Sequence, residues 1–357
     1  MLKPSRYALL ILSLAACGAS DIGLESGERV STYKPSGAFA DFLTGRFAAS
    51  RNDLGTAAEK LESALSEDPG VPELAMQAFL AATLAGRPDA PRLAASLPDN
   101  AIAQLVLADR EANLGHWDRA EVGFGALSQQ QPLTQVLRPL LIAWSQQGQG
   151  RTDAALGTLA PLIEGTRFRG VYALHAALMA DLGGQAAEAA RLYRVAATEY
   201  GPLNLRLGVI LASWQARQGN VAEAQRTIGD LAAGNGDLAI ARQGFEANVS
   251  LPAVRNAADG IAEAYLAMAA TLRQQGSDAA QLMVRFALDL RPDFTAARIL
   301  LADIEDGQKR PAAALATLAE IPVSDPLAPV VSLRRAALLD ETGQSEDATA
   351  LLDELAR

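Results

Sequence analysis

The stretch LHAALMADLGGQAAEAARLYRVA, residues 174–196, decides the fold. Its Ala and Leu residues are strong helix formers, and a pair of glycines interrupts the helical pattern midway. Glycine readily adopts the left-handed backbone conformation in which a chain reverses after a helix. We therefore predict two helices joined by a tight turn, with small Ala177 and Ala189 where the helices touch and Tyr193 where one pair stacks on the next.

This pattern recurs along the chain with a period near 34 residues. An alanine shortly after a Gly or Asn turn, followed four positions later by a large apolar residue, recurs at gaps of 63, 35, 34, 35, 56, 34 and 34 residues. Units of this length bury a continuous core by stacking on their neighbours. The alanines are Ala57, Ala120, Ala155, Ala189, Ala224, Ala280, Ala314 and Ala348.

The enlarged gap before Ala280 predicts an insertion of about twenty residues into the repeat. Residues 237–247 have helical spacing, and Ser250-Leu251-Pro252 then has the form of a helix stop and a fresh start. We expect an irregular helical pair here. The sequence leaves open whether this break is a hinge, a change in superhelix pitch or without consequence.

The repeat resembles the tetratricopeptide repeat (TPR), a helix–turn–helix unit of 34 residues. The last unit has Ala336 in its first helix, Gly343 at the turn, and Ala348 and Leu352 in its second helix. The resemblance implies an all-α fold, a right-handed TPR superhelix (α-solenoid) of about nine helix pairs with one irregular insertion. Residues 260–318 also resemble longer TPR proteins of alphaproteobacteria.

The N-terminal residues have the order of a secretory signal peptide. Lys3 and Arg6 precede an apolar run, and small residues lead from it to Cys17, the only cysteine. The run is too short for a spanning helix, which needs ~20 residues. Residues 14–17, Leu-Ala-Ala-Cys, resemble the lipobox of bacterial lipoproteins, which implies that the chain is cut before Cys17 and acylated there. Because Gly18 stands where an inner-membrane retention signal has Asp, the resemblance implies an outer-membrane location on the periplasmic face.

The residues after Cys17 are rich in Gly and Ser without helical periodicity, which is typical of a flexible tether. These observations divide the chain into five segments. They are a lipoprotein signal peptide at 1–16, the lipidated Cys17 and tether at 17–37, an N-terminal TPR array at 38–231, the irregular insertion at 232–256 and a C-terminal TPR array at 257–357.

Composition excludes several classes of function. With 31 Lys and Arg against 41 Asp and Glu, the chain has a formal net charge of −10, so we expect it to bind no nucleic acid, because phosphate contacts need a basic surface. Two histidines and one cysteine supply no zinc site. We found no nucleophile elbow, phosphate loop or dinucleotide motif. The sequence thus predicts no enzyme, no metal and no cofactor.

The concave face of the array is the best candidate for a binding surface. In TPR proteins, residues of each first helix line that face, and the resemblance assigns this role to apolar, aromatic and a few charged residues. Such a groove holds a peptide by apolar burial, while acids select a basic segment. The residues are Phe39, Phe42, Arg46, Leu140, Trp144, Leu174, Leu178, Val209, Tyr265 and Asp303.

We therefore expect a lipid-anchored periplasmic TPR scaffold that mediates protein–protein interactions in envelope assembly, secretion or polysaccharide export. One alternative is a cell-wall or glycan hydrolase, in which Asp303 or Asp181 lies ~5–10 Å from a second carboxylate in an α/α groove. Another is a structural array that associates with itself through its C-terminal helix, which lacks a polar cap.

Overall fold

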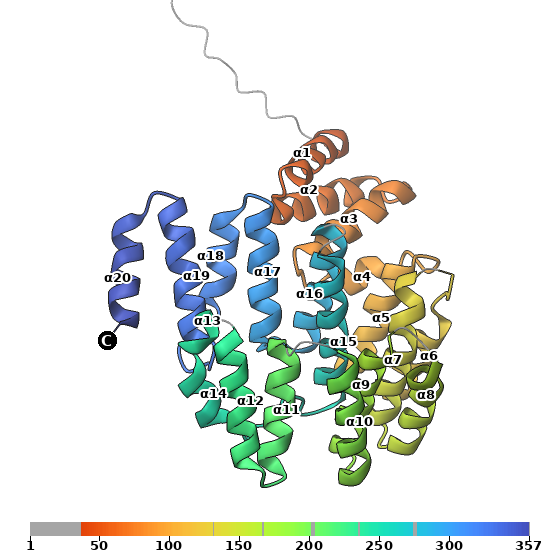
Figure 1. Ribbon diagram of the computed structural model, residues 1–357. Helices are drawn as coiled ribbons and strands as arrows, with labels where there is room; N and C mark the ends of the chain where they lie inside the picture. The colour runs from red at the N-terminus through yellow and green to blue at the C-terminus, as the bar shows by residue number, and fades with distance from the viewer. Residues whose placement is uncertain are drawn as a thin grey trace, which may run out of the picture. The chain divides into compact units, whose positions relative to one another are not determined.

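The computed structural model describes residues 37–130, 132–165, 168–200, 204–234, 236–273 and 277–356. These residues form twenty helices and no strand in that part of the chain, which confirms the all-α expectation (Figure 1). None of the described helices is both long and apolar enough to cross a bilayer. The expected signal peptide, Cys17 and the tether lie outside the described residues.

Eighteen of the helices form nine pairs, and the α-solenoid expectation is confirmed. The short helices α13 (Gly236–Ala239) and α14 (Arg242–Asn248) lie between the sixth and seventh pairs, where we expected an irregular insertion. The pairs are α1 (Ala38–Ser50) with α2 (Leu54–Glu67), α3 (Pro72–Leu84) with α4 (Ala90–Ala94), α5 (Ala101–Asn113) with α6 (Trp117–Ala126), α7 (Pro132–Gly148) with α8 (Thr152–Gly165), α9 (Arg169–Leu182) with α10 (Ala186–Glu199), α11 (Leu205–Arg217) with α12 (Val221–Gly234), α15 (Ala257–Leu272) with α16 (Ser277–Leu290), α17 (Thr295–Gly307) with α18 (Pro311–Ala319), and α19 (Ala328–Glu341) with α20 (Ser345–Leu355).

The periodic alanines are all buried. Seven of the eight have no exposed surface, and Ala348 in the last pair is 5 % exposed. In the eight pairs whose turn the structure describes, the turn after the first helix has a residue with a positive φ, for example 72° at Gly184. Asn52 and Lys309 adopt this conformation where the repeat has no glycine, so the turn geometry persists even where the residue type changes.

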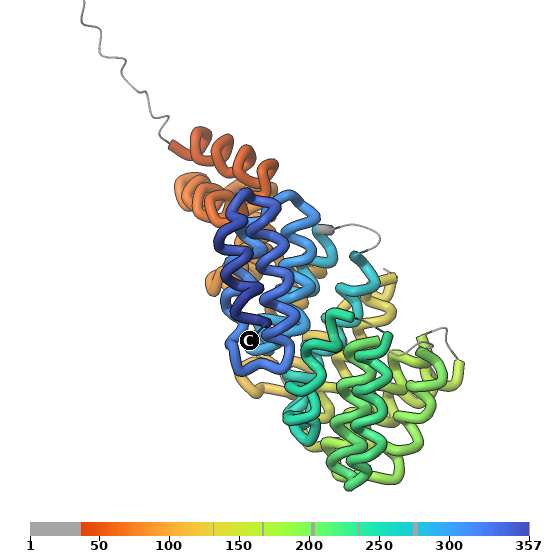
Figure 2. Tube along the Cα trace, turned by 60° about the vertical axis from the view of Figure 1, so that its left-hand side comes forward, coloured from red at the N-terminus to blue at the C-terminus, as the bar shows by residue number. Residues whose placement is uncertain are grey.

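After the insertion, the chain returns to its own first half. Helix α15 packs against α7 and α9, and α16 packs against α3 and α5, although they lie far apart in the sequence (Figures 1 and 2). In a simple solenoid each repeat contacts only its neighbours. The concave face that we expected to serve as a binding surface is therefore partly covered by the chain itself.

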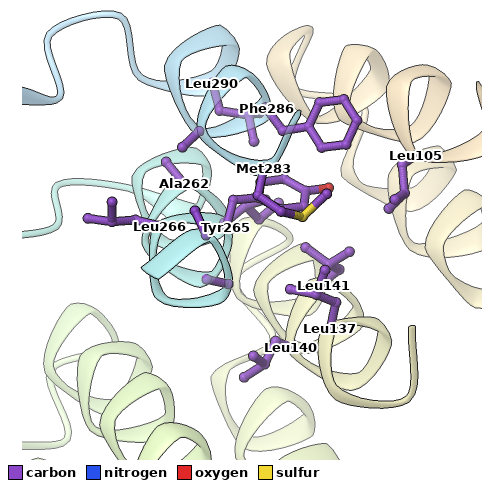
Figure 3. Close-up of a cluster of buried hydrophobic side chains, with 14 of the residues drawn as sticks. Leu105, Leu137, Leu140, Leu141, Ala262, Tyr265, Leu266, Met283, Phe286 and Leu290 are labelled. Carbon is purple, nitrogen blue, oxygen red and sulfur yellow. The ribbon is translucent and has the colours of Figure 1, made fainter. Parts of the chain in front are cut away.

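The contact between α15–α16 and the first half is a packed apolar core. Tyr265 and Phe286 have ring centroids 5.3 Å apart, and with Met283 they point towards α5 and α7 (Figure 3). Leu105 of α5 and Leu141 of α7 meet them there, each no more than 2 % exposed. This cluster joins helices of both halves into one hydrophobic core.

Trp144 shows how tightly α15 lies on α7. A Cβ atom at Gly260 would lie 2.4 Å from the indole of Trp144, so only glycine lets the two helices approach this closely. The indole Nε1 donates a hydrogen bond to Nδ1 of His175, 3.1 Å away. Trp144 has no exposed surface and His175 is 1 % exposed.

A second buried polar contact fixes the position of α15. The hydroxyl of Tyr265 donates to the carboxylate of Asp109 on α5, 2.9 Å from each carboxylate oxygen. Burial raises the pKa of Asp109 well above its ordinary value, and the hydrogen bond from Tyr265 opposes this shift. Because an unpaired buried polar group is unfavourable, this pair favours one alignment of α15 on α5.

The close approach at Gly260 yields a stability prediction. Gly260→Ala places a methyl group against the Trp144 indole, and we expect it to lower the free energy of unfolding by ~1–3 kcal/mol. As a matched control, Gly157→Ala adds a Cβ with no atom within 4 Å and should raise that free energy by ~0.5–1 kcal/mol. Urea denaturation followed by circular dichroism measures both. Equal effects of the two changes would contradict the packing of α15 on α7.

The buried histidine yields a pH prediction. Burial lowers the pKa of His175 from 6.5 to about 4. The neutral form therefore contributes stability that is fully present above pH 6.5 and is lost as the pH falls towards 4. Between these values the wild type should lose ~2–3 kcal/mol more than His175→Gln, whose amide oxygen still accepts from Trp144 but does not titrate. Unfolding free energies across this range test it, with exposed His116→Gln as a control that retains the pH dependence.

Candidate binding groove

An apolar groove runs between the first helices of the N-terminal array and the returned helix α15. Its largest part is a cavity of about 700 Å³ between α9, α11, α15 and α17. Val171, Ala267 and Thr271 also line an adjoining cavity of about 160 Å³ beside α7. We use "the groove" for these two cavities. The large cavity is lined mainly by Leu174, Leu178, Tyr200, Leu205, Leu207, Ile210, Leu266, Ala267, Ala270, Ala296 and Leu300.

The groove exists because α15 lies close to α7 but leaves space beside α9 and α11. Small side chains of α15, such as Ala267 and Ala270, face this space. Leu174 and Leu178, one helical turn apart on α9, lie on the same side of their helix and form part of the opposite wall. The walls are thus regular helices, which hold the lining side chains in fixed positions.

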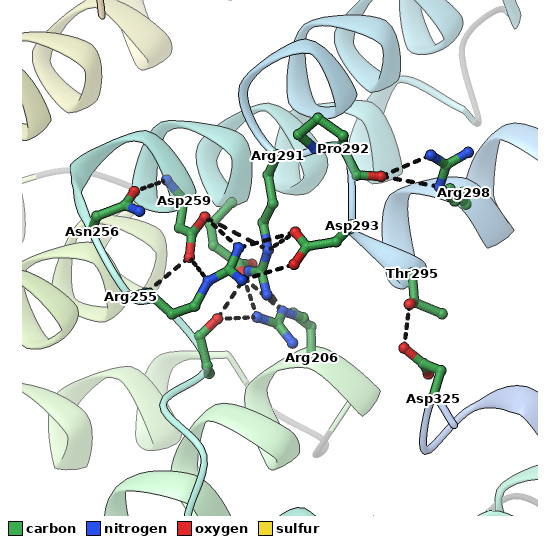
Figure 4. A network of polar contacts seen from close by, with 12 residues as sticks. Arg206, Arg255, Asn256, Asp259, Arg291, Pro292, Asp293, Thr295, Arg298 and Asp325 are labelled. Atoms are coloured by element: carbon green, nitrogen blue, oxygen red, sulfur yellow. Dashed lines mark hydrogen bonds and ion pairs between the residues drawn. The ribbon is translucent and has the colours of Figure 1, made fainter. Parts of the chain in front are cut away.

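A network of three arginines and three acids borders the groove (Figure 4), because two of its members, Arg206 and Glu263, line the 700 Å³ cavity. Arg206 of α11 donates from Nε to both carboxylate oxygens of Glu263 on α15, 2.9 Å from each. Arg206 lines both the 700 Å³ cavity and a further cavity of about 190 Å³ beyond it. Arg206 and Arg291 also lie over the ring of Phe294, 5.2 and 4.5 Å from its centroid.

The rest of the network joins α15 to the end of α16. Arg255 Nε donates to Asp259, 2.7 Å away, and its Nη1 donates to Asp293 at the same distance. The hydrogen bond from Arg255 lowers the pKa of Asp293, and the hydrogen bonds to Asp259 and Asp293 raise the pKa of Arg255. Asp259 and Glu263 are no more than 4 % exposed. With three charges of each sign, the network attracts neither a cationic nor an anionic ligand by net charge.

The acids expected near the groove are also paired. Asp303 contacts Arg334 and lies 3.3 Å from Arg273 Nη1, and it does not line the cavity. Burial raises the pKa of Asp303, against the opposing effect of the two arginines. Asp181 pairs with Arg217. Because arginines hold both acids of the hydrolase alternative, the geometry favours apolar binding over acid–base chemistry.

Four of the sequence-predicted binding residues line one of these three cavities. Leu174 and Leu178 line the 700 Å³ cavity, Leu140 lines the 160 Å³ cavity, and Val209 lines the 190 Å³ cavity. They come from three successive first helices, α7, α9 and α11, as the repeat register predicts.

Two other predicted residues do not lie on an open surface. Trp144 and Tyr265 have no exposed surface, because α15 covers α7 and Tyr265 belongs to the covering helix itself. Their expected exposure on a concave face is therefore wrong, and both belong to the core.

The remaining predicted residues lie elsewhere. Phe39, Phe42 and Arg46 are on α1 and line none of these cavities. Cys17 lies outside the described residues. In α20, only Ala348 is buried and Leu352 is 43 % exposed, so self-association through this helix stays a prediction.

Sequence reasoning missed the wall that α15 contributes. Its residues 260–272, GIAEAYLAMAATL, are apolar on nearly all sides of the helix, with Glu263 as the one charged residue. A helix that is apolar all round is typically buried on all sides, which was the available signal.

In the part of the chain that the structure describes, no group of three or more His, Cys, Asp or Glu could hold a metal ion.

Several solved structures align with this chain at low sequence identity. No family model matches the chain, and no curated protein matches it. Among solved structures, a tetratricopeptide repeat protein from Parabacteroides merdae has 11 % identity and a TM-score of 0.27, over 89 % of this chain and 92 % of that one.

Two structures of protein complexes are also similar. The APC/C hetero-tetramer Cut9–Hcn1 has 14 % identity and a TM-score of 0.33, over 89 % of this chain and 56 % of that one. Naa15/Naa10 bound to HypK has 13 % identity and a TM-score of 0.34, over 88 % of this chain and 57 % of that one. The chain therefore spans little more than half the length of these two proteins.

Proposed function

We propose that this protein is a lipid-anchored periplasmic scaffold that binds an apolar segment of a partner protein in the groove. The observation that carries the proposal is the 700 Å³ cavity, whose walls are mostly leucine, isoleucine and alanine side chains from four helices. A ligand that fills it gains ~25 cal/mol for each Å² of apolar surface buried. The fixed helical walls suit an amphipathic helix or an extended peptide.

The charges near the groove limit the partner's chemistry. Glu263 and Arg206, the charged pair in the wall, bind each other, and Asp303 near the rim binds Arg273 and Arg334. A charged ligand would have to displace one of these partners and leave a buried charge unpaired, which is unfavourable. The proposed ligand is therefore an apolar segment rather than the basic segment that the acids alone suggested.

The location in the proposal rests on the sequence of residues 1–37. The Leu-Ala-Ala-Cys resemblance at 14–17 supports acylation of Cys17, and the following Gly- and Ser-rich residues support a tether to the body. The resemblance to longer alphaproteobacterial TPR proteins suggests a bacterial envelope. In that compartment the scaffold serves envelope assembly, secretion or polysaccharide export.

Cell fractionation tests the anchor. In the proposal, acyl chains on Cys17 hold the protein at the membrane, with ~0.8 kcal/mol for each buried CH₂ group. We expect the wild type in the outer-membrane fraction, with fatty acyl groups on the peptide that begins at Cys17. Cys17→Ala should leave the membrane fraction or remain uncleaved. If mass spectrometry finds that the wild-type peptide carries no acyl group, the proposed lipid anchor is wrong, while the proposed binding in the groove is unaffected.

Site-specific crosslinking tests the groove. Because Cys17 is the only cysteine and is acylated in the proposal, an introduced cysteine becomes the single free thiol. Ala270→Cys places a photoactivatable thiol probe at an exposed position of the large cavity, and Ala316→Cys places it on the exposed surface of α18. We expect a defined apolar peptide of one partner to crosslink at residue 270 and not at residue 316.

A second substitution separates groove binding from chance proximity. Ala267 lines both cavities of the groove, so Ala267→Met fills their junction. It should lower crosslinking at residue 270 by ~tenfold, equivalent to about 1.4 kcal/mol of binding free energy. Ala312→Met, at an exposed position of α18, is the matched control. Equal yields in both variants would contradict binding in the groove.

A further inference from the structure

The first helix, α1, exposes a stripe of large apolar side chains. Phe39, Leu43 and Phe47 follow one another at intervals of four residues, so they lie on one face of the helix. They are 73 %, 50 % and 65 % exposed. Isolated exposed apolar residues are ordinary, but a row of three large ones on one face marks an interaction surface. We call this row the α1 stripe.

The opposite face of α1 already has its packing partner. Ala40, Gly45 and Ala48 are buried, and a Cβ at Gly45 would lie 2.7 Å from the side chain of Leu61 on α2. The helix is thus apolar on two faces, and only one of them packs against the array. The α1 stripe is available to something outside the described helices.

Two arginines accompany the stripe. Arg46 lies over the ring of Phe42 at 5.7 Å, and Arg51 lies over the ring of Phe47 at 5.6 Å. Among the described residues neither guanidinium takes part in an ion pair, whereas many other arginines of this acidic chain do. Exposed phenylalanine and leucine side chains with these two arginines beside them suit the surface of an anionic bilayer, because apolar burial and attraction to anionic headgroups both contribute to binding there.

We propose that the α1 stripe docks on the surface of an anionic phospholipid bilayer. This inference rests on the proposed function, because lipidated Cys17 would bring α1 to that surface. Nineteen residues separate Cys17 from Gly37, which reach at most ~60 Å. α1 is the first described helix after this segment. The acyl chains hold the protein at the membrane, and α1 sets which side of the array faces it.

Vesicle binding tests the stripe without the lipid anchor. We would use residues 17–357 with Cys17→Ser, which retain the compact unit from Ser36 to Arg357. The probe is vesicles of phosphatidylethanolamine and phosphatidylglycerol in a flotation assay. Phe39→Ser with Phe47→Ser should reduce the partition coefficient by ~100-fold, about tenfold for each phenylalanine. Because the chain carries no acyl group, the result does not depend on whether Cys17 is lipidated.

Matched controls distinguish this surface from general apolar exposure. Val122 and Val323 are 74 % and 96 % exposed on other parts of the array, so Val122→Ser with Val323→Ser should bind vesicles as the parent chain does. Arg46→Gln with Arg51→Gln should reduce binding to the level seen with phosphatidylcholine vesicles. Circular dichroism confirms that each variant is folded.

Two results would overturn the proposal. The first is a parent chain that does not float, or a phenylalanine variant that floats equally well. The second is a parent chain that dimerises in light scattering without binding vesicles and becomes monomeric when Phe39 and Phe47 are replaced. In that case a second copy of the chain, not the bilayer, covers the α1 stripe.

Discussion

The whole arrangement depends on the close approach of α15 to α7, where the backbone at Gly260 lies against the indole of Trp144. Two helices approach this closely only where one has no side chain at the crossing. From this contact, α15 reaches α5 through Tyr265 and α11 through Glu263. If α15 stood farther out, the same repeats would form an open array whose concave face was a broad surface. Its actual position converts that surface into core on one side and a narrow groove on the other.

Some of the contacts that hold α15 and α16 against the first half of the chain are polar, and these contacts fix how the helices align. Apolar packing of Phe286 and Met283 supplies burial but tolerates small shifts. Asp109 with Tyr265, and Arg285 donating to the carbonyl of Leu84 at 2.9 Å, are satisfied only at one alignment. Burial raises the pKa of neighbouring Asp289 to about 6, so its protonated form favours the fold below pH 3.8, and this contribution is lost as the pH rises through 6.

The sequence predicted the local elements well because their signals are local. Ala189 and Gly184 define a helix pair within a single repeat, and the same residue types recur at 34-residue intervals, which gives the number of pairs. The packing of α15 and α16 on the first half of the chain brings together residues that are far apart in the sequence, such as Arg285 and Leu84, which are 201 positions apart. A 34-residue repeat pattern does not predict such a contact. For that reason Leu174 and Leu178 do line a cavity, whereas Trp144 and Tyr265 were assigned to an open surface that the chain itself covers.

The pitch of an open helical array can change greatly, because small changes at each junction between repeats add up. Here α16 packs against α3 and α5, while α15 packs against α7 and α9, so these six helices resist stretching together. An array held together in this way cannot wrap around its ligand. A ligand entering between Leu178 and Ala267 would instead meet walls already in place, and little chain entropy would be lost on binding. Such a protein selects ligands by the width of its groove, and the curvature of its body changes little when a ligand binds.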